Sequence, residues 1–463
     1  MFSMKGVALA TILQVAWILP SIPAPGQTLP DKQVASRLQA YLAPFGETGN
    51  LIGTVLVARG GRVLFRQSYG MANEELQVLN SSKTRYHIAS VSKPFTAAAI
   101  LQLQERGRLS VSDPVSRYVP GFPNGDRITL DNLLAHTSGI HDINDVPDYD
   151  TFARSPHTIE ELVAKYAGLP LDFTPGSETR YSNSNYNLLA LVLEKASGES
   201  YEGYLSKHIF GPAGMPDSGA DGDASRLIPS VASGYIPAGI STVEKARYLD
   251  WSNKTGNGSL YSTVDDLYRF DRALNTDVLL KSPTRQKYFV EGPGNYYGWY
   301  VFERAGHRLM SAKGHGVGFT AELDRFPDDD VTIILLSNTY ETASQDPIAG
   351  ALAAIVFGQE VTPPSLRAAP IPESVLASYA GEYQYGPDFY DPNEKFTLSA
   401  RPGFLLMRIG DHHAPVVPIS PTDFIERYFF GHMEFTKDAN GNVTGLTCRY
   451  GKKTFVARRL EGN

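Results

Sequence analysis

Apolar and polar residues follow different patterns in successive parts of the 463-residue chain. Two apolar runs, at 54–59 and 62–66, flank a Gly-Gly pair that is typical of a two-residue turn, and they predict a β-hairpin. Two further runs, at 319–326 and 331–336, predict paired strands joined by a Pro-Asp-Asp-Asp turn. Strands are therefore expected both early and late in the first three quarters of the chain.

Other stretches have apolar residues at helical spacing. Helices are predicted at four places: 31–41, 91–106, 128–134 and 186–196. In the second, Pro94 is tolerated because it falls in the first turn, and Gly107 is a natural end. Residues 141–157 and 215–250 are rich in Asp, Pro, Gly and Ser, and we expect long surface loops there that cover a cleft. The order of elements predicts an α+β domain over 27–357, with an antiparallel sheet flanked by helices and a helical subdomain.

The end of the chain has a different character. Prolines concentrate at 358–372, which predicts a linker, and short alternating apolar runs separated by turn residues follow over 373–463. That pattern is typical of a small all-β unit, either a barrel or a sandwich. The single cysteine, Cys448, lies in one of these runs and is expected to be a small apolar core residue rather than a reactive thiol.

The first residues have the layout of a secretory signal peptide. One lysine precedes an apolar run at 6–19 and small residues follow, so we expect a leader over 1–26. An uncleaved membrane anchor is the alternative, although the run is short for a span and Pro20 ends it. The protein is therefore predicted to be exported, periplasmic or secreted, with no stable membrane span after removal of the leader.

Charge and motifs exclude several classes of function. The net charge of −7 gives no electrostatic reason to expect a nucleic-acid partner. The sequence has no Gly-x-Ser-x-Gly elbow, no His-Glu-x-x-His and no Gly-rich phosphate loop after a strand. We therefore expect no metal and no cofactor, and a small molecule or a short peptide as substrate.

The strongest candidate for chemistry is a serine three residues before a lysine at the start of the helix predicted at 91–106. At that spacing the side chains of Ser90 and Lys93 lie on one helix face, so the amine can accept the hydroxyl proton and the serine can be acylated. The alternative is a capping serine followed by an exposed lysine, but the helix is apolar. A neutral lysine costs about 4–5 kcal/mol at pH 7 unless burial lowers its pKa.

Two downstream motifs complete the candidate site. The phenol of Tyr181 can both donate and accept, so it can share the proton of Ser90 and pass it to a leaving group. Asn183 offers an amide to the substrate. His315 lies between two glycines just before a predicted strand, where a substrate backbone can approach closely. Taken alone, each of these two motifs is more often a simple turn, but the combination with Ser90 and Lys93 is much harder to dismiss.

With these motifs the chain resembles the serine β-lactamase-related superfamily, which includes class C β-lactamases, D-alanyl-D-alanine carboxypeptidases, D-aminopeptidases and family VIII esterases. The resemblance covers roughly residues 35–355, and it also includes the run from Leu133 to Ile140, Thr174-Pro175-Gly176, and the run from Gly258 to Leu267. The tail resembles the lipocalin-like β-barrel that follows this domain in some peptidase-like members.

The resemblance implies a role for each motif residue. Ser90 would be the acylated nucleophile, Lys93 its base and Tyr181 the proton shuttle, while Asn183 would bind substrate.

The third motif, around His315, departs from the family pattern. His315 would stand where many members carry a lysine, and the N–H groups of Ser90 and Gly318 would form the oxyanion hole. The family usually has glycine two residues after the histidine or lysine, but this chain has Val317. The register of the strand is therefore open. The valine would narrow the cleft and disfavour the binding of bulky β-lactams.

The expected activity is hydrolysis of an amide or ester through an acyl-enzyme. A peptidase acting on peptides that contain D-amino acids leads, and a carboxylic esterase or a weak β-lactamase is the alternative. A catalytically idle binding protein of the cell envelope is the non-enzymatic interpretation. Oligomeric state stays open at this point.

Overall fold

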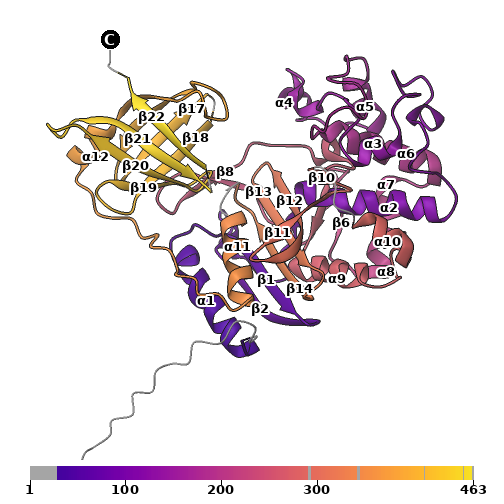
Figure 1. Ribbon diagram of the computed structural model, residues 1–463, viewed down its shortest axis with the longest axis horizontal. Coiled ribbons are helices and arrows are strands. Elements are labelled where there is room, and N and C mark those ends of the chain that lie inside the picture. Colours follow the sequence, from indigo (N-terminus) through magenta and orange to yellow (C-terminus); the bar gives the residue numbers. More distant parts are fainter. Residues whose placement is uncertain (1–28, 290–293, 341–344, 411, 452, 461–463) are drawn as a thin grey trace, which may run out of the picture.

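The computed structural model describes residues 29–289, 294–340, 345–410, 412–451 and 453–460 (Figure 1). The expected leader over 1–26 lies outside these residues. None of the helices in the described ranges combines the length and the apolar character that crossing a bilayer requires.

A seven-stranded antiparallel sheet forms the centre of the first domain, in the order β10-β11-β12-β13-β14-β1-β2. Its strands are β1 (Gly53–Arg59), β2 (Arg62–Tyr69), β10 (Asn295–Tyr296), β11 (Trp299–Arg304), β12 (His307–Gly316), β13 (Phe319–Phe326) and β14 (Val331–Ser337). The predicted hairpin and the predicted late strands are confirmed, and β1 pairs directly with β14. The sheet therefore joins the two ends of this domain, as the sequence predicted.

Helices cover both faces of the sheet (Figure 1). α1 (Asp31–Glu47) and α11 (Gln345–Val356) share a core with Ile333 and Leu335 of β14. On the other face, α2 (Lys93–Glu105) and α6 (Asn183–Ser197) share the larger core with Ile334 and Leu336. Successive side chains of a strand point to opposite faces, so burial on both faces explains the unbroken apolar run at 333–336 in β14.

The remaining helices of the described chain form the helical subdomain and its connections. The α-helices are α3 (Leu130–Leu134), α4 (Tyr149–Phe152), α5 (Ile159–Ala167), α7 (Tyr201–Leu205), α8 (Gly211–Ala213), α9 (Val264–Leu274) and α10 (Ser282–Tyr288). The short turns are η1 (Ala89–Ser92), η2 (Val115–Arg117), η3 (Ile143–Asp145), η4 (Ser206–Phe210) and η5 (Trp251–Lys254). Short strands β3 (Met71–Asn73), β4 (Val78–Leu79), β5 (Tyr86–His87), β6 (Gly219–Ala220), β7 (Tyr235–Pro237), β8 (Val243–Lys245) and β9 (Leu260–Ser262) form small separate sheets.

Several predicted boundaries need correction. The first helix continues to Glu47 rather than ending at residue 41, because its apolar stripe continues through Leu42 and Phe45 into the core. α6 begins at Asn183 instead of 186. Residues 89–92 form the 3₁₀ turn η1, so α2 begins at Lys93 rather than at residue 91. The predicted loops at 141–157 and 215–250 also contain short elements, among them η3 and β7.

The C-terminal part is a closed eight-stranded antiparallel barrel, which decides between the barrel and the sandwich. Its strands are β15 (Gly381–Tyr385), β16 (Lys395–Arg401), β17 (Phe404–Ile409), β18 (His412–Pro418), β19 (Asp423–Glu426), β20 (Gly431–Lys437), β21 (Val443–Tyr450) and β22 (Lys453–Arg459). The preceding helix α12 (Glu373–Tyr379) packs Leu376 and Tyr379 into the barrel core. Cys448 is buried in that core, as predicted.

One buried arginine links the barrel to the first domain. The guanidinium of Arg427 donates to the carbonyl oxygens of Gly49 and Gly239 and, at 3.1 Å, to Asn50 Oδ1. A buried acceptor that loses its donor pays the full cost of leaving water. Arg427 therefore holds together two segments of the first domain and the barrel.

Replacing this arginine is expected to loosen the junction. Arg427→Met should lower the free energy of unfolding by about 3 kcal/mol, because it leaves buried carbonyl groups without donors. Chemical denaturation would measure the change, with Arg408→Met on the exposed face of β17 as the matched control. Equal stability of the two variants would contradict the proposed linking role.

Candidate active site

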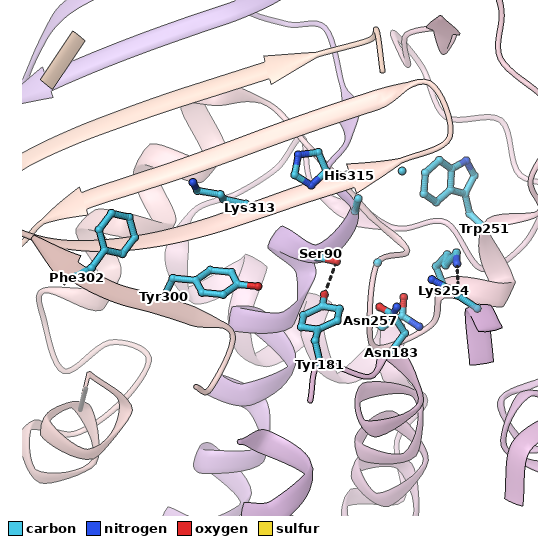
Figure 2. A pocket seen from close by; sticks show the side chains of 14 residues that line it. Ser90, Tyr181, Asn183, Trp251, Lys254, Asn257, Tyr300, Phe302, Lys313 and His315 are labelled. Atoms are coloured by element: carbon cyan, nitrogen blue, oxygen red, sulfur yellow. Dashed lines mark hydrogen bonds between the residues drawn. The ribbon is translucent and has the colours of Figure 1, made fainter. Parts of the chain in front are cut away.

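Ser90 lies in the turn η1, immediately before the buried helix α2. The residue before it, Ala89, has φ +45°, a left-handed conformation that a non-glycine residue adopts only when its surroundings enforce it. Ser90 Oγ lies 2.9 Å from Lys93 Nζ and accepts a hydrogen bond from Tyr181 Oη at 2.8 Å. The structure therefore brings the three predicted catalytic side chains into direct contact, and Figure 2 shows the hydrogen bond between Tyr181 and Ser90.

Lys93 is fully buried, and three oxygen atoms surround its Nζ. Besides Ser90 Oγ, these are Asn183 Oδ1 and the Asn257 carbonyl oxygen, each at 2.9 Å. Burial lowers the pKa of Lys93 well below its ordinary value; the Asp142 carboxylate opposes this shift and the Lys254 ammonium adds to it. A neutral amine has two N–H groups and one lone pair, so it can bond both acceptors and still receive the proton of Ser90.

Tyr181 immediately precedes Ser182, the extended residue at the N-terminal end of α6. Burial raises the pKa of Tyr181 above its ordinary value, although its hydrogen bond to Ser90 opposes the shift. The phenol is therefore protonated at neutral pH and can donate a proton. The neutral amine of Lys93 is therefore able to accept a proton, and the phenol of Tyr181 is able to donate one.

His136 is a residue of this site to which the sequence analysis gave no role. Its ring stacks on the Tyr181 ring with centroids 4.5 Å apart, and its Nδ1 accepts from the Ser182 N–H at 3.2 Å. Nε2 lies 3.3 Å from Asn295 Oδ1, so it carries the proton. Burial and the nearby Lys93 lower the pKa of His136 to about 3. His136 is therefore neutral, and its ring packs against Tyr181 and orients the phenol. In the sequence, the only indication of His136 was its place in the run from Leu133 to Ile140.

Asn183 bridges the buried amine of Lys93 and the carboxylate of Asp142. Its Oδ1 accepts from Lys93, and its Nδ2 donates to Asp142 Oδ2 at 3.0 Å. The amide therefore connects the amine to a carboxylate that the sequence analysis did not single out. Asn183 also lines the cavity beside Ser90, which leaves its predicted contact with substrate possible through the second Nδ2 hydrogen.

The third motif forms the last three residues of β12. Gly314 packs so tightly that an added Cβ would lie 2.1 Å from the Ile88 carbonyl oxygen and 3.2 Å from Ser90 N. Side chains alternate along a strand, so His315 projects from the opposite face to Gly314 and is exposed beside the cavity. Gly318 lies in the two-residue turn between β12 and β13, with φ +78° and Gly234 beside it. Gly316, not Gly318, is among the residues lining the cavity.

A cavity of about 470 Å³ opens beside Ser90, and its lining includes Tyr181, Asn183, His315 and Gly316. Figure 2 shows Tyr300 and Phe302 on one side of Ser90, and Trp251 and Lys254 on the other. Polar and aromatic groups thus converge on one reactive hydroxyl, which is typical of a small-substrate site. Within the ranges that the structure describes, no group of three or more His, Cys, Asp or Glu residues is arranged to hold a metal ion.

Comparisons with known proteins agree with this geometry. A family model described as Beta-lactamase matches residues 38–356. The chain is 31% identical over 430 residues to penicillin-binding protein 4* of Bacillus subtilis (strain 168), covering 86% of this chain and 93% of that protein. A penicillin-binding protein of Bacillus halodurans is similar at 27% identity and TM-score 0.60, covering 69% of this chain and 98% of the other. A D-stereospecific amidohydrolase of Streptomyces sp. is similar at 25% identity and TM-score 0.58, covering 70% and 98%.

The close packing of Gly314 gives a prediction about the turn that holds Ser90. In Gly314→Ala the new methyl group would displace Ile88 and Ser90, and a displacement of about 1 Å can reduce a rate about 100-fold. The measurement is the rate at which a fluorescent penicillin acylates the protein. Gly222→Ala is the matched control, because nothing lies within 4 Å of its added Cβ. An unchanged rate in Gly314→Ala would contradict the constraint.

The lowered pKa of Lys93 gives a prediction about pH and stability. Between that pKa and about 10.4, the unfolded chain binds a proton that the folded protein does not, so the free energy of unfolding rises with pH. Lys93→Met should lose this contribution, which reaches at most about 1.4 kcal/mol per pH unit. Denaturation at pH 7, 8, 9 and 10 would measure it, with the exposed Lys32→Met as control. Parallel profiles for wild type and Lys93→Met would show that Lys93 is charged in the folded protein.

Proposed function

The chain belongs to the beta-lactamase family and is a serine hydrolase, and we propose that it cleaves amide bonds in peptides containing D-amino acids through an acyl-enzyme at Ser90. The observation that carries this proposal is the contact of one hydroxyl, Ser90 Oγ, with both Lys93 Nζ and Tyr181 Oη. An amine and a phenol on the same hydroxyl provide an acceptor and a donor for one proton transfer.

The proposed reaction has two acyl transfers. Lys93 Nζ accepts the Ser90 proton while Oγ attacks the substrate carbonyl carbon, and the bond to the leaving nitrogen breaks as Tyr181 Oη protonates it. Lys93 then returns the proton that it took from Ser90 to Tyr181, so both groups regain their starting protonation before water attacks. Water then attacks the acyl-enzyme with the same groups acting in reverse, which releases the acid and restores Ser90.

The developing oxyanion needs donors beside Ser90. We propose the N–H of Ser90 and the N–H of Gly316, because both residues line the cavity. Gly318, the donor expected from the resemblance, remains a prediction; its place in the β12–β13 turn against Gly234 supports Gly316 instead. His315, exposed beside the cavity, is proposed to contact the outer part of the substrate rather than Ser90.

Two of the similar proteins support the substrate class. One is a D-stereospecific amidohydrolase and another a penicillin-binding protein. A carboxylic esterase or a weak β-lactamase would use the same acyl chemistry, and an idle envelope protein would bind without turnover. We also propose that the protein is exported, on the basis of the leader expected over 1–26. The proposed domains cover 27–357 and 373–463, with a linker over 358–372.

Ser90→Ala tests the proposal directly. Turnover of D-alanine 4-nitroanilide and covalent labelling by a fluorescent penicillin should both fall about 1,000-fold or more, because the nucleophile is lost. The L-alanine analogue should react more slowly with the wild type, and the exposed Ser112→Ala should match the wild type. Folded wild-type protein that is inert toward amides, esters and β-lactams alike would favour the idle binding protein.

A further inference from the structure

Two lysines, Lys254 and Lys313, line the cavity. No carboxylate of the described chain forms an ion pair with Lys254. Lys254 Nζ donates to the neutral Asn144 Oδ1 at 2.8 Å and lies 4.7 Å from the centre of the Tyr149 ring. The side chain is only partly exposed and lines the same cavity as Ser90. Its ammonium is therefore oriented by a neutral amide and an aromatic ring, and its charge is open to an anion entering the cavity.

The other lysine on the cavity wall is in a different situation. Lys313 Nζ binds the Asp346 carboxylate, and Glu322 Oε1 lies 3.9 Å away. Although burial opposes it, these two carboxylates raise the pKa of Lys313. The charge of Lys313 is thus already compensated within the protein, whereas that of Lys254 is compensated only at longer range.

The two lysines also lie at opposite ends of the cavity. In Figure 2, Lys313 lies on the same side of Ser90 as Tyr300 and Phe302, and Lys254 lies on the other side with Trp251. In Figure 2, Asn183 lies on the same side of Tyr181 as Lys254, and Tyr300 lies on the other side. Asn183 is the residue expected to bind the substrate amide, so we place the acyl group that stays on Ser90 toward Lys254 and the leaving group toward Tyr300.

From this arrangement we infer that Lys254 binds a carboxylate on the acyl part of the substrate, so that the preferred substrates are amides or esters of acidic acyl groups. The inference rests on the proposed acyl chemistry at Ser90 and makes its substrate class more specific. During the reaction the acyl carbon passes from the leaving nitrogen or oxygen to Ser90 Oγ and then to water. The distal carboxylate keeps its charge throughout, held by a charge-assisted hydrogen bond.

A matched pair of esters tests the assignment. 4-Nitrophenyl hydrogen succinate carries a carboxylate on its acyl group, and 4-nitrophenyl butyrate is its uncharged counterpart of similar length. The wild type should favour the succinate by at least tenfold in kcat/KM, mainly through KM. Lys254→Met should lower that ratio at least tenfold, and Lys254→Arg should retain most of it. Lys245→Met, an exposed lysine on β8, should leave the ratio as in the wild type.

The ratio should also depend on pH. Burial lowers the pKa of Lys254 to about 8, with Asp142 and Asp150 opposing the shift and Arg247 adding to it. The preference for succinate should therefore decline as pH rises from about 7 to 10. In Lys254→Met, loss of a cation near Lys93 should also move the acid limb of the butyrate profile to higher pH, because it raises the pKa of Lys93.

Three outcomes would overturn the inference. One is equal use of both esters by the wild type, and another is an unchanged ratio in Lys254→Met. The third is a preference only for esters whose phenol leaving group carries the carboxylate. Each of these outcomes is a change in the relative rates for two esters, measured in a protein that is active. Failure of the proposed function would look different, because no ester would then show Ser90-dependent turnover.

Discussion

The protein depends on one amine that is kept out of water without being paired to a carboxylate. Burial, together with the nearby Lys254 ammonium, disfavours the charge of Lys93. Ser90, Asn183 and Asn257 replace the hydrogen bonds that water would give. Such an arrangement stabilises the neutral amine at the expense of the folded state at neutral pH, because the unfolded chain gains a proton. Apolar packing around α2 and α6 must offset that loss, and this is the physical reason for a helix that is buried on every side.

Much of this organisation could be predicted from local patterns. The Gly-Gly pair, the apolar runs that became β13 and β14, and the turn-separated alternation of the tail each depend on neighbours within a few residues. The contact between Ser90 and Lys93 follows from their spacing near one helix. Tyr181 was predicted as a partner from its chemistry and from the family resemblance, and the structure places its phenol on Ser90.

Other features depend on contacts between distant segments, which no local pattern reveals. His136 and Tyr181 stack only because α3 and α6 pack together, and Asp142 reaches Asn183 from a segment that looked like a polar loop. No local pattern distinguishes Lys254, since its burial comes from the fold around it. The place of Gly318 depends on the length of one hairpin, and Val317 had already made that register uncertain.

The direct pairing of β1 with β14 has a consequence for the order in which the molecule is made. A ribosome must release residues 331–337 before the strand at 53–59 finds its inner neighbour, so the nascent chain carries an unpaired apolar edge through most of its synthesis. Contacts so far apart in sequence also slow folding. A chaperone that shields the hairpin β1–β2 until β14 is available would therefore raise the yield of folded protein.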